Sequence, residues 1–389
     1  MRLLYSTLVP ALTLTVLSPQ AFAEAPTDFE LGLEGIIVIT PISDDQNAAQ
    51  SQTMLGEFSL TAEAEKLLDN GTRLRFRTAL RSQIDHPQRP GGSGEFGNAS
   101  GEPMGAFSAI GTGTPLDQPA LRSRLETAYV QIDGGYGELR VGKDRGVAAR
   151  FHEGAPGVLS HARLDSALLD PSGLSLLRTR HDLTGPSAKL SYATPRLLGL
   201  RAGVSFTPDA NADGLDRRIR LAEGDVSNTV EVALNGSRYI RDQDLRLEGS
   251  LGWSRGELEA SAPSPLYRDT VETWSAGIRL ERHDWTAGIS WLKSDDGLLA
   301  GDYEAWSAGL SRQLGNLALA LSYGETEIAS PRPNARSWRV GGAFPISQTA
   351  GIGLSYYSEE LKGSPFRSKS EGIVVEITLS TQIFGFSEN

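Results

Sequence analysis

The chain of 389 residues contains no cysteine. This absence excludes disulfide scaffolds, thiolate metal sites and cysteine nucleophiles. After the first 23 positions the chain also lacks any run close to the roughly 20 apolar residues that a membrane-spanning helix needs. The net charge is −11, the pI is about 5.1 and the mean hydropathy is −0.25, so we expect no nucleic acid partner.

The N-terminus has the layout of a secretion signal. Met1 and Arg2 give a basic start, residues 3–17 form an apolar stretch, and Ala21-Phe22-Ala23 reads as an A-x-A cleavage site. The apolar stretch is too short to anchor the chain by spanning a bilayer. We therefore predict a signal peptide over residues 1–23 and one mature domain over residues 24–389.

Segments of about ten residues alternate between an apolar face and a small or polar face, which is typical of tilted membrane strands. Hydropathy alone misses such strands, because only alternate residues face the lipid. The clearest segments are residues 244–255, 273–281, 285–291 and 317–324.

The connections between these segments take turns in being short and long. The short ones are residues 69–71, 134–137, 195–199, 242–244, 283–284, 314–316 and 344–348, and most are good hairpin turns. The long ones are residues 41–53, 85–120, 145–177, 208–226, 257–268, 294–302, 327–334 and 360–369. The pattern predicts an all-β fold, a transmembrane antiparallel β-barrel of about 16 strands with both termini at the short-turn rim.

A secreted or surface β-rich binding protein, built as a sandwich or a β-helix, is the alternative interpretation. The aromatic residues favour the barrel, because membrane barrels carry aromatic girdles at the two interfaces. We assign these residues to the apolar strand faces: Tyr129, Trp253, Trp274, Trp285, Trp291, Trp306 and Trp338.

Residues 127–143 form a strand, a glycine turn and a second strand that ends in Gly142-Lys143, and this segment resembles the general Gram-negative porin family. The resemblance continues through the third long connection to residues 189–195 and 199–204. It implies an outer-membrane porin of a Gram-negative bacterium, a homotrimer in outer-membrane lipid that passes small hydrophilic solutes and ions by passive diffusion. It also implies that the third long connection folds into the lumen.

In the porins that the chain resembles, carboxylates of the third loop face basic residues on the wall. Four arginines alternate with mostly apolar residues over 73–81, and we expect them to face the lumen, because a charge facing lipid at mid-membrane costs about 2–4 kcal/mol. A position near the rims is the alternative, and the register of the pair at 122 and 124 stays open. The candidate constriction residues are Arg73, Arg75, Arg77, Arg81, Arg122, Arg124, Arg178, Arg180, Glu153, Asp165 and Asp170.

No catalytic constellation is visible, since the five histidines at 86, 152, 161, 181 and 283 fall in loops, turns or strand ends. An outer-membrane enzyme built on a barrel would need a catalytic pair that the sequence does not display. Residues 209–214 begin like a calcium-binding loop, but Arg220 stands where the bidentate glutamate should fall. We predict no enzymatic activity, no cofactor and no metal. An excess of arginine at the constriction predicts weak anion selectivity.

Overall fold

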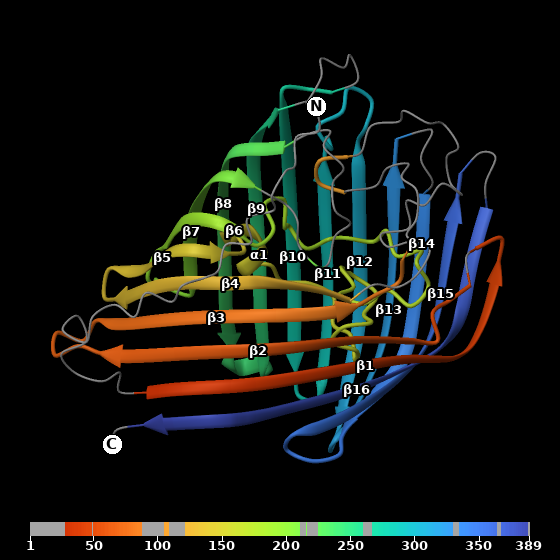
Figure 1. Ribbon diagram of the computed structural model, residues 1–389, viewed down its shortest axis with the longest axis horizontal. Helices are drawn as coiled ribbons and strands as arrows, with labels where there is room; N and C mark the ends of the chain where they lie inside the picture. Colours follow the sequence, from red (N-terminus) through yellow and green to blue (C-terminus); the bar gives the residue numbers. More distant parts are fainter. Residues whose placement is uncertain are drawn as a thin grey trace, which may run out of the picture.

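The computed structural model describes residues 28–48, 50–87, 105–108, 121–210, 215, 225–259, 267–329, 334–363 and 367–387. These residues form one closed barrel of sixteen antiparallel strands, in which β1 (Asp28–Gln46) pairs with β16 (Arg367–Ser387) (Figure 1). This confirms the predicted antiparallel β-barrel. The expected signal peptide lies outside the described residues. Among those described, no helix is long and apolar enough to cross a membrane.

Each remaining strand pairs with its two neighbours in sequence. The strands are β2 (Met54–Leu67), β3 (Arg73–Ile84), β4 (Leu121–Gly134), β5 (Gly137–Asp144), β6 (Ser187–Ala193), β7 (Leu200–Ala210), β8 (Asp225–Ile240), β9 (Leu245–Glu259), β10 (Thr270–Arg282), β11 (Trp285–Ser294), β12 (Tyr303–Leu314), β13 (Leu317–Ile328), β14 (Asn334–Pro345) and β15 (Ala350–Lys362). One helical turn, α1 (Val147–Arg150), follows β5.

One rim of the barrel carries the short turns that the sequence predicts. Most of these turns contain a residue with positive φ, for example Asp244 at φ 49° and His283 at φ 51°. The paired strand ends Asp28 and Ser387 lie at this same rim, next to the turn between β2 and β3. Both ends of the described barrel are therefore at the short-turn rim.

The outer face of the barrel is apolar and the inner face is small and polar. Along β10, Trp274 and Ile278 are exposed, whereas Thr273 and Ser275, on the two sides of Trp274, are buried. All six tryptophans lie on the outer face of β9 to β14, and Trp253 and Trp274 contact each other with ring centroids 6.2 Å apart. An apolar outer face is stable because the bilayer replaces water around it.

Tyr129 does not lie on the apolar face, so its assignment from the sequence was wrong. Its side chain is 5% exposed, and the guanidinium of Arg140 lies 4.5 Å from the ring centroid. Tyr129 pairs directly with Arg77 of β3, and directly opposite residues share one face of a sheet. The tyrosine faces inward because its ring stacks with a cation there.

Residues 145–186, which connect β5 and β6, are called the inner loop below. This loop contacts the inner face on opposite sides of the barrel. The backbone N–H of Ser160 donates to Glu376 on β16 at 2.7 Å, and His181 hydrogen-bonds Ser254 on β9 at 2.7 Å. In Figure 1 the chain after β5, drawn in yellow to green, runs between the walls of the barrel.

An apolar core forms between the inner loop and one side of the wall. Buried loop residues such as Leu174, Leu176 and Leu177 pack with Leu292 and Tyr303 of the wall. Phe107, from the connection between β3 and β4, joins the same core. The core thus extends along the wall from β7 to β15, and the charged inner side chains gather mainly along β1 to β7.

Candidate channel constriction

The predicted arginine row of β3 faces the interior. Arg75 pairs with Glu65 of β2 at 2.7 Å, and Arg77 pairs with Glu63 at 3.6 Å. Arg73 also reaches Glu65, at 2.9 Å. The structure therefore brings these three arginines together. They pair with glutamates of the neighbouring strand β2 and not with carboxylates of the inner loop.

Arg81 lies deeper and contacts the inner loop through a carboxylate. Its guanidinium pairs with Glu57 at 2.5 Å and with Glu126 at 3.3 Å. Glu57 in turn contacts the ring of His161 in the loop at 3.2 Å. All four side chains are largely buried, so the two carboxylates compensate the buried cation.

Arg122 and Arg124 also face inward, which resolves the register that the sequence leaves open. Arg124 stands directly opposite Arg81, and Arg122 donates to Gln83 at 3.1 Å. A β-bulge next to this pair inserts one extra residue, so Glu126 also reaches Arg81. The strand pattern alone does not reveal such a bulge.

A second arginine cluster surrounds Glu138 on β5. Arg140 and Arg201 pair with this carboxylate at 3.0 and 2.9 Å, and Arg150 of α1 pairs with it as well. Asp144 also pairs with Arg140, at 2.6 Å, so three guanidiniums face two carboxylates and an excess of one positive charge remains. This cluster was not predicted from the sequence. Its only signal was that Glu138 and Arg140 alternate along one face of β5.

Asp165 and Asp170 of the inner loop hold the loop together. Asp165 accepts hydrogen bonds from the N–H and the hydroxyl of Thr179, at 3.0 and 2.6 Å. Asp170 accepts from the N–H groups of Gly173 and Ser175, both at 3.0 Å. Their side chains are 8% and 1% exposed. The structure does not bring these two carboxylates to the β3 arginine row.

Glu153 is the loop carboxylate that stays accessible. It lies 3.9 Å from Arg279 of β10 and accepts a hydrogen bond from Asn235 of β8 at 3.3 Å. Burial and the nearby charge of Glu248 raise its pKa. Arg279 was not predicted from the sequence, because it is the single arginine on the inner face of β10, among mostly small residues.

Three arginines surround His152 in the inner loop. The pKa of this imidazole is lowered to about 4, chiefly by burial and in addition by the charges of Arg180, Arg163 and Arg279, against the opposing effect of Asp165. The imidazole is therefore neutral near pH 7. Of the two arginines predicted after the loop turn, Arg180 is partly exposed and donates to the carbonyl of Ala149 at 3.3 Å.

Arg178 is the other predicted arginine, and its side chain is 8% exposed. Its backbone N–H donates to the hydroxyl of Tyr303 at 2.9 Å, which ties this part of the loop to β12. Arg178 therefore lies inside the packed part of the barrel.

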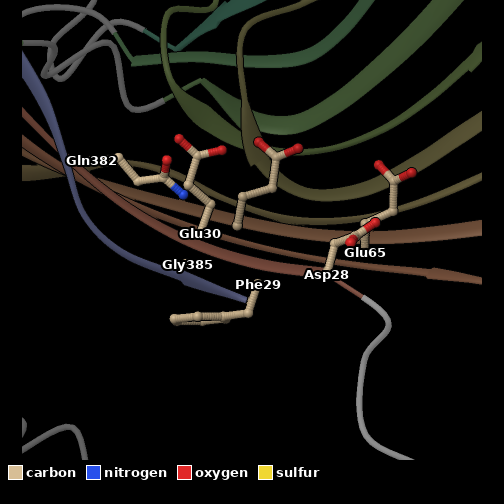
Figure 2. Close-up of a pocket in the computed structure, with 7 residues that line it drawn as sticks. Asp28, Phe29, Glu30, Glu65, Gln382 and Gly385 are labelled. Atoms are coloured by element: carbon tan, nitrogen blue, oxygen red, sulfur yellow. The ribbon is translucent and has the colours of Figure 1, made fainter. Parts of the chain in front are cut away.

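The interior near the short-turn rim is acidic. A cavity of about 430 Å³ is lined by residues of β1, β2 and β16, among them Asp28, Glu30, Glu63 and Glu65. Figure 2 shows Glu30, Glu65 and Gln382 on one side of the sheet and the ring of Phe29 on the other. The described residues include no group of three or more histidine or carboxylate side chains that fits a metal ion. Positions 211–214 of the calcium-like segment lie outside the described residues.

A closed barrel with an apolar outer face, a charged interior and a loop across that interior defines a membrane channel protein. The family model for Gram-negative porins matches residues 11–364, so the chain belongs to the Gram-negative porin family. It forms an outer-membrane channel for the passive diffusion of small hydrophilic solutes and ions.

Solved structures show the same fold at low sequence identity. Pseudomonas putida OprB is 9% identical with a TM-score of 0.58, covering 93% of this chain and 96% of its own. Salmonella typhi OmpF is 11% identical with a TM-score of 0.56, covering 91% and 97%. An anion-selective porin from Comamonas acidovorans is 13% identical with a TM-score of 0.54, covering 92% and 99%. No curated protein sequence matches the chain.

Proposed function

We propose that this porin conducts anions in preference to cations. The observation that carries the proposal is that two carboxylates of the inner loop are more deeply buried than two of its arginines. Asp165 and Asp170 are buried and fully engaged in the loop's own hydrogen bonds, whereas Arg163 and Arg180 remain partly exposed. A permeating ion therefore meets more guanidinium than carboxylate.

The wall supports the same preference. Around Glu138 three arginines face two carboxylates, Glu138 and Asp144, and the arginine side chains are 13–25% exposed. Charges that line a narrow passage act at short range and are screened less than charges on the outer loops. The net charge of −11 is therefore a poor guide to selectivity. The Comamonas acidovorans porin, similar in fold, is described as anion-selective.

Reversal potentials test this proposal. The purified protein, inserted in a planar bilayer, should raise the current in discrete steps and show a reversal potential of anionic sign in a KCl gradient. A cation-selective or non-selective wild type would contradict the proposal. Discrete current steps without selectivity would contradict the anion preference alone and would still support a channel.

We also propose a homotrimer whose interface is the wall from β1 to β5. All six tryptophans lie on β9 to β14, and girdle tryptophans favour the lipid interface. The outer face of β2 to β5 instead exposes aliphatic side chains and phenylalanines, such as Phe58, Phe76, Leu80 and Val130. Vibrio cholerae OmpT, similar in fold, is described in a trimer form.

The mass of the detergent-solubilised protein tests the trimer. Light scattering on a size-exclusion column, corrected for bound detergent, should give three chains per particle. Cysteine at Phe76 should cross-link to a second chain with a short bifunctional reagent, while cysteine at Ile289 on β11 should not. A single-chain mass would contradict the proposal.

We propose no catalytic activity and no bound cofactor. The histidines of the inner loop serve as structural contacts, since His161 binds Glu57 and His181 binds Ser254 and Ser275. Removal of residues 1–23 during export is also part of the proposal. N-terminal sequencing of the membrane-extracted protein should begin at Glu24.

A further inference from the structure

A cavity of about 270 Å³ lies between the inner loop and the wall, away from the acidic rim. Loop residues 152–157 form one side of it, and the returning chain at 163–165 forms another. Arg279 of β10 and Ser322 of β13 complete the lining from the wall. The cavity is thus built from two passes of one loop and two strands.

The loop is held in place at this cavity by close packing against the wall. Ser322 donates to the carbonyl of Pro156 at 2.9 Å, and the N–H of Glu153 donates to Ser250 at 2.9 Å. A β-carbon on Gly309 would lie 2.5 Å from the Pro156 carbonyl oxygen, so the loop touches the wall there. The lining of the cavity is therefore preformed, which lowers the entropic cost of binding a ligand.

Two guanidiniums face this cavity with hydrogen-bonding capacity to spare. Arg279 makes one long ion pair with Glu153, at 3.9 Å, and its Nε is buried without an acceptor in the part of the chain that the structure describes. Arg163 donates its Nε to the carbonyl of Asp165 at 2.6 Å and pairs with no carboxylate among the described residues. A buried donor without an acceptor is destabilising, so an anionic acceptor at Arg279 would satisfy a hydrogen bond that the protein itself leaves unmade.

The rest of the lining is partly apolar. Pro156, Leu159 and Leu164 contribute hydrocarbon surface beside the two guanidiniums. Ligand sites commonly combine an apolar wall with a few polar groups that fix orientation. A halide ion would use only the guanidiniums of this lining and not its apolar part, and a neutral sugar would not use the charge of the guanidiniums.

We propose that the cavity is a binding subsite for small organic acids, in which Arg279 and Arg163 hold a carboxylate and Pro156, Leu159 and Leu164 contact its short apolar chain. This proposal rests on the anion preference proposed above and names the class of anion. A water molecule occupies about 30 Å³ in the liquid, so the cavity holds roughly nine groups of that size. Acids of about four to six carbons fit this volume.

Hexanoate is the probe, with acetate and hexanamide as comparisons. Hexanoate should interrupt the single-channel current of the wild type in a concentration-dependent way, and butyrate and acetate should do so at progressively higher concentrations. Hexanamide, which has the same chain and no charge, should leave the current unchanged. Calorimetry on the detergent-solubilised protein should give the same order of affinity.

Two variants locate the subsite. Arg279→Gln and Arg163→Gln should each weaken hexanoate binding tenfold or more, because each removes a charge-assisted hydrogen bond. The matched control is Arg246→Gln, which removes an inner-face arginine of β9 that is 52% exposed and outside the cavity lining. This control should keep the wild-type affinity for hexanoate.

The outcomes separate the two proposals. An anion-selective wild type that hexanoate does not block, or equal weakening by Arg279→Gln and Arg246→Gln, overturns the subsite and leaves the anion preference standing. A wild type without anion preference overturns the proposed function by its reversal potential alone. Loss of hexanoate binding in both cavity variants, with binding retained in the control, supports the subsite.

Discussion

The carbonyl oxygen of Glu153 lies against the α-carbon of Gly277, so close that a β-carbon on this glycine would come within 1.9 Å of the oxygen. The same contact recurs on the next two strands, where a β-carbon on Gly288 or Gly309 would lie 2.6 or 2.5 Å from a loop carbonyl. The small inner-face residues noted in the sequence thus form a groove that seats the inner loop.

Gly277→Ala should push the inner loop away from the wall and lower the single-channel conductance, because a β-carbon cannot approach a backbone oxygen closer than about 3 Å. Overpacking of this kind costs about 1–3 kcal/mol, which a barrel of sixteen strands tolerates. Gly32→Ala on β1 is the control, since a β-carbon there has no neighbour within 4 Å. Equal conductance in the two variants would mean that the loop does not rest in this groove.

The absence of cysteine allows a direct test of strand register. With cysteine in place of Arg77, a charged thiol reagent added to the bath should reduce the channel current, because this side chain faces the interior and is 44% exposed. Cysteine in place of the neighbouring Phe76, on the outer face, should leave the current unchanged. Block in the Phe76 variant would reverse the assignment of faces on β3.

The barrel was predictable because its rules are local. Alternation along each strand and alternation of short and long connections define the strands, their number and the arginine face of β3. The roles of Asp165 and Asp170 were not predictable, because their partners are backbone N–H groups that only the folded loop brings near. The cluster around Glu138 was missed because β5, β7 and α1 each supply one or two charges.

Glu376 should anchor the inner loop. Its two carboxylate oxygens accept from the N–H groups of Ser160, His161 and Ala162 at 2.7–2.9 Å and from the Ser160 hydroxyl. Glu376→Gln turns an NH₂ group toward these donors and should cost the local structure about 3 kcal/mol. Hydrogen exchange of residues 155–165 should accelerate by about a hundredfold.

Glu371→Gln on the same strand is the control, because Glu371 pairs with the partly exposed Lys369. Its hydrogen exchange at residues 155–165 should match the wild type. Protection that survives in Glu376→Gln would show that the glycine groove alone holds the loop.

His152 should make the folded protein less stable in acid. Its pKa falls from 6.5 to about 4 in the folded state, because burial and three arginines oppose the charged imidazole. The unfolded chain therefore binds more protons than the folded protein between about pH 6.5 and pH 4, and stability falls as the pH falls through this window. His152→Gln should remove this part of the pH dependence of the unfolding midpoint. His283→Gln, in an exposed turn, should keep it.

Ion selectivity tests whether the β3 arginine row, which lies beside the glutamates of β2, lines the ion path. Arg75 pairs with Glu65 at 2.7 Å and Arg77 with Glu63 at 3.6 Å, so replacing both arginines by serine leaves two inner-face carboxylates without these partners. An ion about 8 Å from a unit charge in water gains or loses about 0.5 kcal/mol, which is about a twofold change in preference for each charge. The screening length of about 10 Å near 0.1 M salt reduces this effect only in part.

The double variant Arg75→Ser/Arg77→Ser should therefore shift the reversal potential in a KCl gradient toward cations. The matched variant Glu63→Gln/Glu65→Gln should shift it toward anions by a similar amount, because it removes the opposite charges at the same level of the channel. The two shifts must have opposite signs if this stretch of β2 and β3 lies beside the ion path. Unaltered selectivity in both variants would place the ion path away from the row, nearer the arginines around Glu138 and the inner loop.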